Sequence, residues 1–128
     1  MGQEMITRLI DSVILIDHLN GLEKATQFIL KLDPEKTAIS VITRAEVRAG
    51  VDEESEAMVK SLLDQYQIFI LDGRIADLAA TLRRDTGWKL PDAFQAALSV
   101  HHLVKLVTRN TRDFDPRKHH FVEVPYSL

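Results

Sequence analysis

The sequence predicts a single α/β domain, folded as a three-layer α/β/α sandwich with a mostly parallel central sheet. Short apolar or β-branched runs alternate along the chain with longer segments of helical periodicity, which is the pattern of strands joined by crossover helices. Asn-Gly, Asp-Pro and Asp-Gly pairs separate these segments. A chain of 128 residues buries a sizeable core, and no repeat, low-complexity tract or long linker divides residues 1–128 into smaller units.

The first half of the chain is expected to contain two strands and four helices. Arg8-Leu9-Ile10 is a short strand, and the amphipathic helix after it stops at an Asn20-Gly21 break. Asp33-Pro34 ends a second helix, β-branched residues from Thr37 favour a strand, and Thr43 is placed to open the next helix. The expected strands are 8–10 and 37–41, and the expected helices are 12–19, 22–32, 43–50 and 53–65.

The second half continues the alternation. Ile68 to Leu71 is a continuous apolar run, short enough to be a buried parallel strand, and Asp72-Gly73 turns the chain into a helix that reaches Asp85. Gly87 interrupts the pattern, and Leu90-Pro91-Asp92 then begins another helix. The remaining expected elements are this helix as far as residue 102, a buried strand at 106–108 and an edge strand at 121–124.

The amino-acid composition limits which side-chain groups can form a functional site. The chain has no cysteine, so it lacks disulfides, a thiolate nucleophile and zinc–cysteine sites, and its site must use oxygen or imidazole groups. Its apolar stretches are too short to span a membrane and no cationic leader precedes one, so we expect a soluble, cytoplasmic protein. The net charge is −3, but residues 105–118 carry five cations against two acids and form a locally basic segment.

Four acidic residues are expected to meet at one edge of the sheet. Ligands of an open parallel sheet bind beyond the carboxyl ends of its strands. Asp11 follows the first strand, Glu46 follows the second after a short turn, and Asp113 lies in the loop after the 106–108 strand. Asp92 stands in the first turn of a helix that returns to the start of a strand, so it also lies at the carboxyl edge. All four carboxylates are therefore predicted to face one cleft.

Each acid also has a purely local explanation. Thr43 to Glu46 fits a capping box, in which Glu46 would only accept the backbone amide of Thr43. Asp11 can cap the helix after it, Asp92 can compensate a helix dipole, and Asp113 fits an Asx turn. The functional interpretation therefore depends on the coincidence of the four positions.

A cluster of carboxylates needs a cation. Two carboxylates about 4 Å apart repel by about 1 kcal/mol in water and by about 4 kcal/mol at an effective dielectric of about 20, so they protonate or move apart unless a cation joins them. All-oxygen ligands suit Mg²⁺ or Mn²⁺, and Mg²⁺ shares its shell with phosphate oxygens. The predicted chemistry is cleavage of a phosphodiester by a metal-activated water.

The residues around the four acids resemble the PIN-domain nucleases and, within them, the VapC toxins of bacterial and archaeal toxin–antitoxin pairs. The resemblance covers nearly the whole chain. It rests on Leu9-Ile10-Asp11-Ser12 with the following Leu15-Ile16-Asp17, on Ser40 to Glu46 with Gly50, on Leu90-Pro91-Asp92-Ala93, and on Val107-Thr108-Arg109-Asn110 through Asp113-Phe114. Val13 departs from the family, which often has a second small or hydroxyl residue there.

The resemblance implies a metal-dependent endoribonuclease, usually a homodimer, inhibited by an antitoxin protein whose C-terminal segment occupies the cleft. The implied cofactor is Mg²⁺ or Mn²⁺, the implied substrate is RNA, and the implied metal-binding and catalytic acids are Asp11, Glu46, Asp92 and Asp113. Polar support near the metal is implied for Ser12, Thr108 and Asn110. The candidate contacts to RNA or antitoxin are the arginines beside these acids, namely Arg44, Arg48, Arg109 and Arg112.

Several alternatives stay open. Trp88 either stacks on a base, packs under a loop or packs in a dimer interface. The adjacent histidines at 101–102 and 119–120 point apart, which disfavours a shared metal. The other functions considered are a catalytically idle PIN-like binding module and an acid-cluster phosphatase or receiver-type phosphotransfer protein. The sequence lacks the Asp-x-Asp of such a phosphatase and the acidic pair of a receiver. The number of ions, the RNA target, the antitoxin, the dimer interface and the choice between Asp113 and Asp115 are open too.

Overall fold

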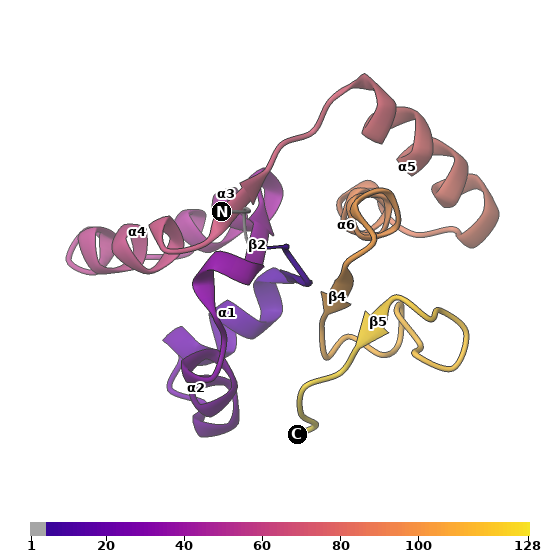
Figure 1. The fold of residues 1–128 in the computed structure, drawn as a ribbon. Coiled ribbons are helices and arrows are strands. Elements are labelled where there is room, and N and C mark those ends of the chain that lie inside the picture. Colours follow the sequence, from indigo (N-terminus) through magenta and orange to yellow (C-terminus); the bar gives the residue numbers. More distant parts are fainter. Residues whose placement is uncertain (1–4) are drawn as a thin grey trace.

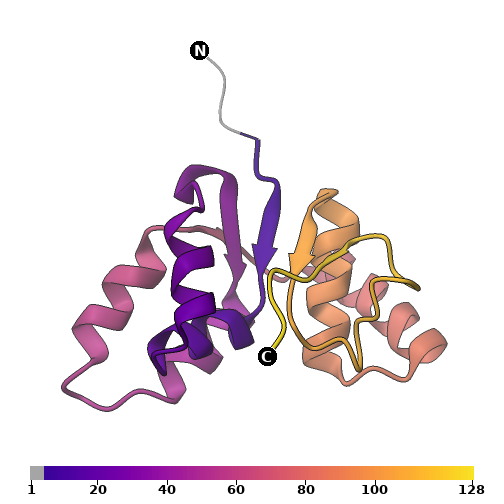
Figure 2. The same ribbon diagram turned by 90° about the horizontal axis from the view of Figure 1, so that it is seen from below.

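The computed structural model describes residues 5–128, which form a five-stranded sheet with helices on both faces (Figure 1). The strand order is β3-β2-β1-β4-β5, and every neighbouring pair is parallel. Figure 2 shows β2, β1 and β4 (purple, indigo and orange) side by side and pointing the same way. The strands are β1 Arg8–Ile10, β2 Thr37–Ser40, β3 Gln67–Phe69, β4 Lys105–Val107 and β5 Val122–Glu123. The predicted α/β sandwich is confirmed.

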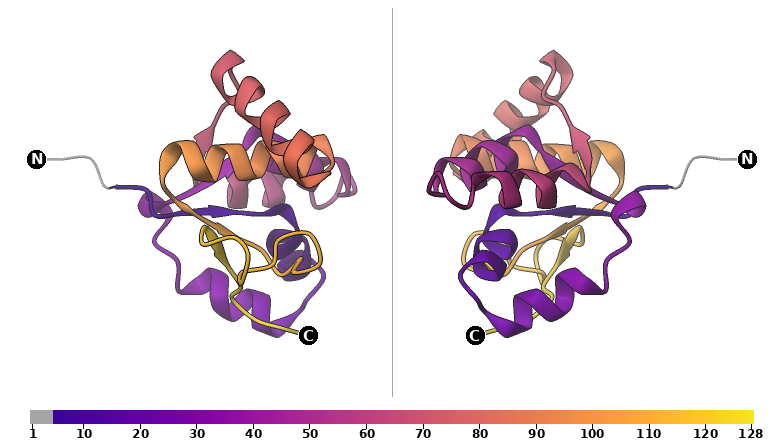
Figure 3. Two further views of the ribbon diagram at one scale, coloured as in Figure 1. Left: turned by 90° about the vertical axis from the view of Figure 1, so that its right-hand side faces the viewer. Right: turned by 90° about the vertical axis from the view of Figure 1, so that its left-hand side faces the viewer.

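Six α-helices and one 3₁₀ helix connect the described strands. Helices α1 to α4 contribute side chains to one buried cluster and α5 and α6 to the other, so the sheet lies between two helical layers. Figure 3 shows α6 and α2 on opposite sides of the sheet. No helix within residues 5–128 is both long and apolar enough to cross a membrane. The helices are α1 Ser12–Leu19, α2 Glu23–Leu30, η1 Pro34–Lys36, α3 Val41–Ala49, α4 Glu56–Asp64, α5 Gly73–Thr86 and α6 Leu90–His102.

Alternate residues of the central strands face two separate cores. Leu9 and Leu106 belong to the cluster under α5 and α6, whereas Ile10 and Val107 belong to the cluster under α1 to α4. All four are fully buried, which explains why these strands are apolar without alternation. Because Ile10 of β1 pairs with Val107 of β4, the two residues that follow this pair meet at the carboxyl edge.

Helix α3 begins earlier than the sequence predicted. Its N-cap is Ser40, whose Oγ accepts the backbone N–H of Thr43 at 3.1 Å, and its first residue is Val41. Thr43 is therefore a buried residue inside the helix, and the prediction that it opens the helix was wrong. The capping-box explanation of Glu46 fails with it, since that explanation required Thr43 as the N-cap.

The other boundaries differ little from those expected. The largest difference is at the start of α4, where the Asp52 carboxylate accepts the N–H of Ser55 at 2.9 Å. This bond holds residues 52–55 in a turn, so that the helix begins at Glu56. Helix α2 buries Ala25 and Ile29, and α4 buries Val59 and Leu63.

Strand β3 is an edge strand, contrary to the expectation of a buried one. It pairs only with β2. Ile68 in the strand is 46% exposed, and Ile70, just after the strand, is 66% exposed. Within the strand only Phe69 faces the core. The apolar run was misleading because a strand is buried by its neighbours in the sheet, and β3 has a neighbour on one side only. The edge position expected for the last strand is confirmed by β5.

We expect Ile39→Ala to lower the free energy of unfolding by about 3 kcal/mol and Ile68→Ala to lower it by less than about 1 kcal/mol. The two isoleucines are register partners on β2 and β3, but Ile39 is fully buried while Ile68 lies at the open edge. Urea-induced unfolding of the two variants measures the difference. Equal losses would contradict the edge position of β3.

Candidate functional site

A cleft opens beyond the carboxyl ends of the central strands, with a volume of about 410 Å³. Three of the four predicted acids line it. Asp11 follows β1, Glu46 lies on α3 after β2, and Asp92 stands in the first turn of α6. The other lining residues come from α1, α6 and the loop after β4, and they are Ser12, Val13, Pro91, Gln95, Arg109, Asn110, Thr111 and Arg112.

Asp11 is the most enclosed of the four acids, with 8% of its surface exposed. It is the N-cap of α1, and its Oδ1 accepts the N–H of Ser12 at 2.9 Å. Its Oδ2 accepts the hydroxyl of Thr108 at 2.8 Å, and the amide nitrogen of Gln95 donates to Oδ1 at 3.3 Å. These donors offset the desolvation of a buried carboxylate. Asp11 is thus both a helix cap and a cleft residue.

The charges of the other three acids reach Asp92. Burial, followed by the negative charges of Asp11, Asp113 and Glu46, raises the pKa of this carboxyl from 3.8 to about 6. The positive charge of Lys89 opposes the shift only in part. Asp92 therefore lies within electrostatic reach of Asp11, Glu46 and Asp113 at the carboxyl edge of the sheet.

Glu46 and Asp113 are exposed, in contrast to Asp11. Glu46 lines the cleft from α3. Asp113 lies beside the cleft, where it lines a neighbouring cavity of about 440 Å³ and accepts a hydrogen bond from Nδ2 of Asn110 at 2.9 Å. The structure therefore brings three acids into one cleft and places the fourth next to it, close enough for its charge to act on Asp92.

Asp115, the other candidate for the fourth acid, is bound to Arg117. Its two oxygens accept the Arg117 guanidinium at 3.1 and 3.0 Å, and the backbone N–H of the same residue at 2.9 Å. The side-chain hydrogen bond from Arg117 lowers the pKa of Asp115 to about 2. The Asx turn that was expected at Asp113 is formed by Asp115 instead. These contacts favour Asp113 as the acid that belongs to the cluster.

The loop after β4 carries two of the three predicted polar supports. Thr108 is fully buried, and its hydroxyl donates to Asp11 and accepts the backbone N–H of Asn110 at 3.1 Å. Asn110 in turn donates to Asp113. Ser12 lines the cleft and binds Asp11 through its backbone N–H. The loop thus links the first acid to the fourth.

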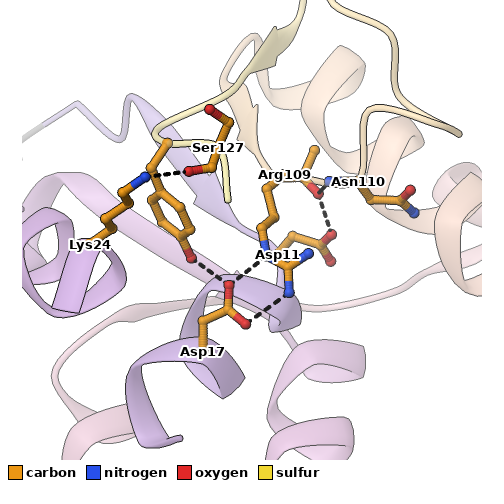
Figure 4. Close-up of polar contacts among 8 residues, drawn as sticks. Asp11, Asp17, Lys24, Arg109, Asn110 and Ser127 are labelled. Atoms are coloured by element: carbon orange, nitrogen blue, oxygen red, sulfur yellow. Dashed lines mark hydrogen bonds and ion pairs between the residues drawn. The ribbon is translucent and has the colours of Figure 1, made fainter. Parts of the chain in front are cut away.

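Arg109 is held by a buried carboxylate outside the predicted site. Its Nε and Nη2 donate to the two oxygens of Asp17 at 2.5 and 2.9 Å, and the Tyr126 hydroxyl donates to the same carboxylate at 2.8 Å (Figure 4). The hydrogen bond from Arg109 lowers the pKa of Asp17. Lys24 also holds the C-terminal segment, through a bond of 2.7 Å to the carbonyl of Ser127. The cleft-lining guanidinium is therefore fixed in place.

Two of the other candidate arginines are already in ion pairs. Arg44 binds Asp64 at 2.9 Å, and Arg48 binds Glu56 at 2.8 Å. Arg112 is exposed and lines the cleft. Of the four predicted arginine contacts, Arg112 is the one most available to an anionic ligand.

Trp88 packs under a loop, which was one of its three expected roles. It is 7% exposed, its Nε1 donates to the carbonyl of Asp113 at 2.8 Å, and its ring contacts Phe114 and His119. A tryptophan buried in this way cannot stack on a base, so that alternative was wrong.

The acids offer the donors that a hard divalent ion prefers, but they are spread apart. In residues 5–128, no three His, Cys, Asp or Glu side chains are arranged so that they could hold one metal ion. Carboxylates without a cation between them repel one another, and this repulsion adds to the effect of burial in raising the pKa of Asp92. The chemistry of the set, carboxylates without sulfur or imidazole among the cleft-lining residues, fits Mg²⁺ or Mn²⁺.

Gln95 is a cleft residue that the sequence analysis missed. It is 2% exposed, and its amide nitrogen donates to Thr43 at 2.8 Å as well as to Asp11. Its position was readable, since it follows Asp92 by three residues and so lies on the same face of α6 one turn later. A polar residue on the buried face of a helix, next to a predicted site residue, is the signal that identifies it.

The chain is similar to known proteins over nearly its whole length. Residues 8–118 match the model of the family described as PIN domain. A toxin-antitoxin complex from Klebsiella pneumoniae is 34% identical with a TM-score of 0.87, over 95% of this chain and 100% of that chain. FitAcB from Neisseria gonorrhoeae is 22% identical with a TM-score of 0.78, over 95% and 100% of the two chains. DNA-bound VapBC from Salmonella typhimurium is 19% identical with a TM-score of 0.74, over 87% and 92%. No curated protein matches the sequence.

We expect Asp92→Asn to stabilise the protein at neutral pH in the presence of a chelator. Because the folded-state pKa is raised, ionisation of Asp92 destabilises the fold as the pH rises from about 4 through about 6. The shift from 3.8 to about 6 corresponds to about 3 kcal/mol, which solvent screening of a partly exposed group reduces to about 1 kcal/mol. Thermal unfolding at about pH 7.5 and about pH 4.5 measures the gain, which should shrink at the lower pH.

The control for this measurement is Asp77→Asn, which removes an exposed carboxylate from α5, away from the cleft. It is expected to leave the stability unchanged at both pH values. A gain for Asp92→Asn that is equally large at both pH values would show that charge repulsion is not its cause.

We also expect Tyr126→Phe to lower the free energy of unfolding by about 1.5 kcal/mol, because it removes a hydrogen bond to the charged, buried Asp17. Tyr66→Phe is the matched control, since Tyr66 is buried but its hydroxyl makes no hydrogen bond to residues 5–128. Chemical denaturation of both variants gives the comparison. Similar small losses in the two would mean that Tyr126 does not anchor the C-terminal segment.

Proposed function

The chain belongs to the PIN domain family, and from this premise we propose that it is a metal-dependent endoribonuclease that acts as the toxin of a toxin–antitoxin pair. The observation that carries the proposal is the acidic cleft, in which Asp11, Glu46 and Asp92 line one cavity and the charge of Asp113 reaches Asp92. The 34% identity to a toxin-antitoxin complex supports the toxin role.

The proposed ligands of Mg²⁺ or Mn²⁺ are the carboxylates of Asp11, Glu46, Asp92 and Asp113. When bound, such an ion polarises the scissile phosphodiester and provides a nucleophilic water near neutral pH. The protein's own contribution is to hold the acids in place. The Thr108 hydroxyl donates to Asp11 and accepts the backbone N–H of Asn110, whose side chain donates to Asp113.

Binding of RNA requires positive charge near the acids, since a polyanion has to approach a carboxylate cluster. Arg112 is exposed at the cleft, and Arg109 lines the same wall in an orientation fixed by Asp17. A guanidinium that is already ordered loses little side-chain entropy when it binds a phosphate. Lys118 lines the neighbouring cavity, which Arg112 also lines, so it extends the positive charge beyond the cleft.

The proposed partners are RNA, an antitoxin protein and a second copy of the chain. The antitoxin would occupy the cleft and compete with RNA for Arg112. A shallow groove of about 490 Å³, lined by Arg44 and Arg48 on α3, lies on the helix that carries Glu46 and offers the antitoxin a second contact. A second copy of the chain would cover the apolar side chains exposed at the β3 edge. The proposed location is the cytoplasm, where the protein would meet both RNA and an antitoxin.

Because the chain belongs to the PIN domain family, the phosphatase and receiver alternatives are rejected. The remaining alternative is a catalytically idle PIN-like module, which would bind an antitoxin in the same cleft without cutting RNA. Cleavage of RNA distinguishes the nuclease from the idle binding module.

We expect the purified protein to cleave RNA when Mg²⁺ or Mn²⁺ is added and to be inactive in chelator. Asp11→Asn and Asp92→Asn should each lower the cleavage rate by roughly 100-fold or more, because each removes a charge that the ion needs. Gel electrophoresis of defined RNAs measures cleavage, and thermal unfolding shows that the variants are folded. Asp77→Asn on α5 should cleave at the normal rate.

Two outcomes would contradict the proposal. Cleavage that persists in both acid variants would place the active site elsewhere. Failure of the unmutated protein to cut any RNA, together with no rise in melting temperature on adding either ion, would support the idle binding module.

A further inference from the structure

Gln95 connects the elements that carry the three cleft acids. It lies on α6 three residues after Asp92, and its amide nitrogen donates to Oδ1 of Asp11 after β1. The same nitrogen donates to Oγ1 of Thr43, which precedes Glu46 by three residues on α3. Residues three apart lie on the same face of a helix. The Gln95 side chain therefore links the α6 face that carries Asp92, the α3 face that carries Glu46 and the Asp11 carboxylate itself.

The orientation of the Gln95 amide follows from its partners. An ionised carboxylate only accepts hydrogen bonds, so the NH₂ group has to face Asp11 and the amide cannot be reversed. Its Oε1 is then left buried without a hydrogen-bond partner. A buried acceptor without a partner destabilises a fold. The amide orientation that leaves Oε1 unpaired is the same orientation that lets Nε2 donate to Asp11.

Neither partner of Gln95 needs it in order to be hydrogen-bonded. Oδ1 of Asp11 also accepts the N–H of Ser12, and Oγ1 of Thr43 also receives the Ser40 hydroxyl at 3.4 Å. An apolar side chain of similar size at position 95 would leave each of these two oxygens with a hydrogen bond, and it would remove the unpaired Oε1. Such a variant loses one of the three donors to the buried Asp11 carboxylate and gains from removal of the unpaired Oε1, so these opposing effects on stability do not by themselves account for a glutamine there.

We propose that Gln95 is a positioning residue, which fixes the plane of the Asp11 carboxylate for binding a divalent cation and ties α3 and α6, the helices that carry Glu46 and Asp92, to that carboxylate. The inference rests on the proposed function, since it concerns the ion that those acids would hold. Thr108 fixes Oδ2 of Asp11 from one side, and Gln95 with the α1 N-terminus fixes Oδ1 from the other. Groups that orient metal ligands in this way affect metal affinity and rate without touching the substrate.

The test is Gln95→Met, a change that keeps the side-chain length and removes both hydrogen bonds. The melting temperature in chelator is expected to stay the same or to rise. The Mn²⁺ concentration that gives half of the maximal thermal shift is expected to rise about 10-fold, and kcat for RNA cleavage to fall about 10-fold or more, with KM within about 2-fold. Gln95→Leu is the second apolar variant and should behave in the same way.

The matched control is Ser99→Ala, because Ser99 is the other side chain within residues 5–128 that has a buried, unpartnered polar atom. It lies one turn further along α6 and does not line the cleft. Ser99→Ala should leave the Mn²⁺ midpoint and kcat unchanged. Losses as large as those of Gln95→Met would overturn the proposal, since they would reflect a general sensitivity of α6.

The remaining outcomes separate the inference from the function on which it rests. Normal Mn²⁺ response and kcat in folded Gln95→Met would overturn the positioning role and leave the proposed nuclease standing. A large loss of melting temperature in both apolar variants would assign Gln95 to the fold alone. Absence of both cleavage and Mn²⁺ response in the unmutated protein would overturn the proposed function and this inference with it.

Discussion

The structure depends on keeping one carboxylate buried at the end of its central strand. Asp11 follows β1, the middle strand of the sheet, and it is 8% exposed. A buried charge persists only if donors surround it, and the donors come from α1, from α6 and from the residue after β4. The parallel pairing of β1 with β4 brings Thr108 to this carboxylate. The cleft lies where these segments converge on Asp11.

The convergence of negative charge on the cleft works against the stability of the fold. Burial and, after it, repulsion from the other acids raise the pKa of Asp92 to about 6, so the ionised Asp92 carboxylate destabilises the fold at neutral pH. The unpaired Oε1 of Gln95 is a second local conflict in the same cleft. Elsewhere in the described part of the chain the central strands are buried among apolar side chains. Two such conflicts in one cleft are typical of a site shaped by function, and one further unpaired polar atom, Oγ of Ser99 on α6, lies outside the cleft.

Positive charge at the cleft is of two kinds. The Arg109 guanidinium is locked by the two oxygens of Asp17, which the Tyr126 hydroxyl also binds, so its position is set by α1 and by the C-terminal segment (Figure 4). Arg112 is exposed and adjustable. A fixed cation aligns a phosphate, whereas an exposed one adapts to different partners. This combination suits a cleft for which we propose both RNA and an antitoxin as ligands.

The sequence by itself determined the order of strands and helices, and the carboxyl-edge position of the acids, because hydrophobic periodicity and capping signals are local properties of the chain. Tertiary structure decided that β3 lies at the edge, since burial of a strand depends on its neighbours. It also decided which polar groups meet. Gln95 and Asp11 are 84 residues apart, and Tyr126 and Asp17 are 109 apart. No local pattern encodes such pairs, because they form only when packing brings distant segments together.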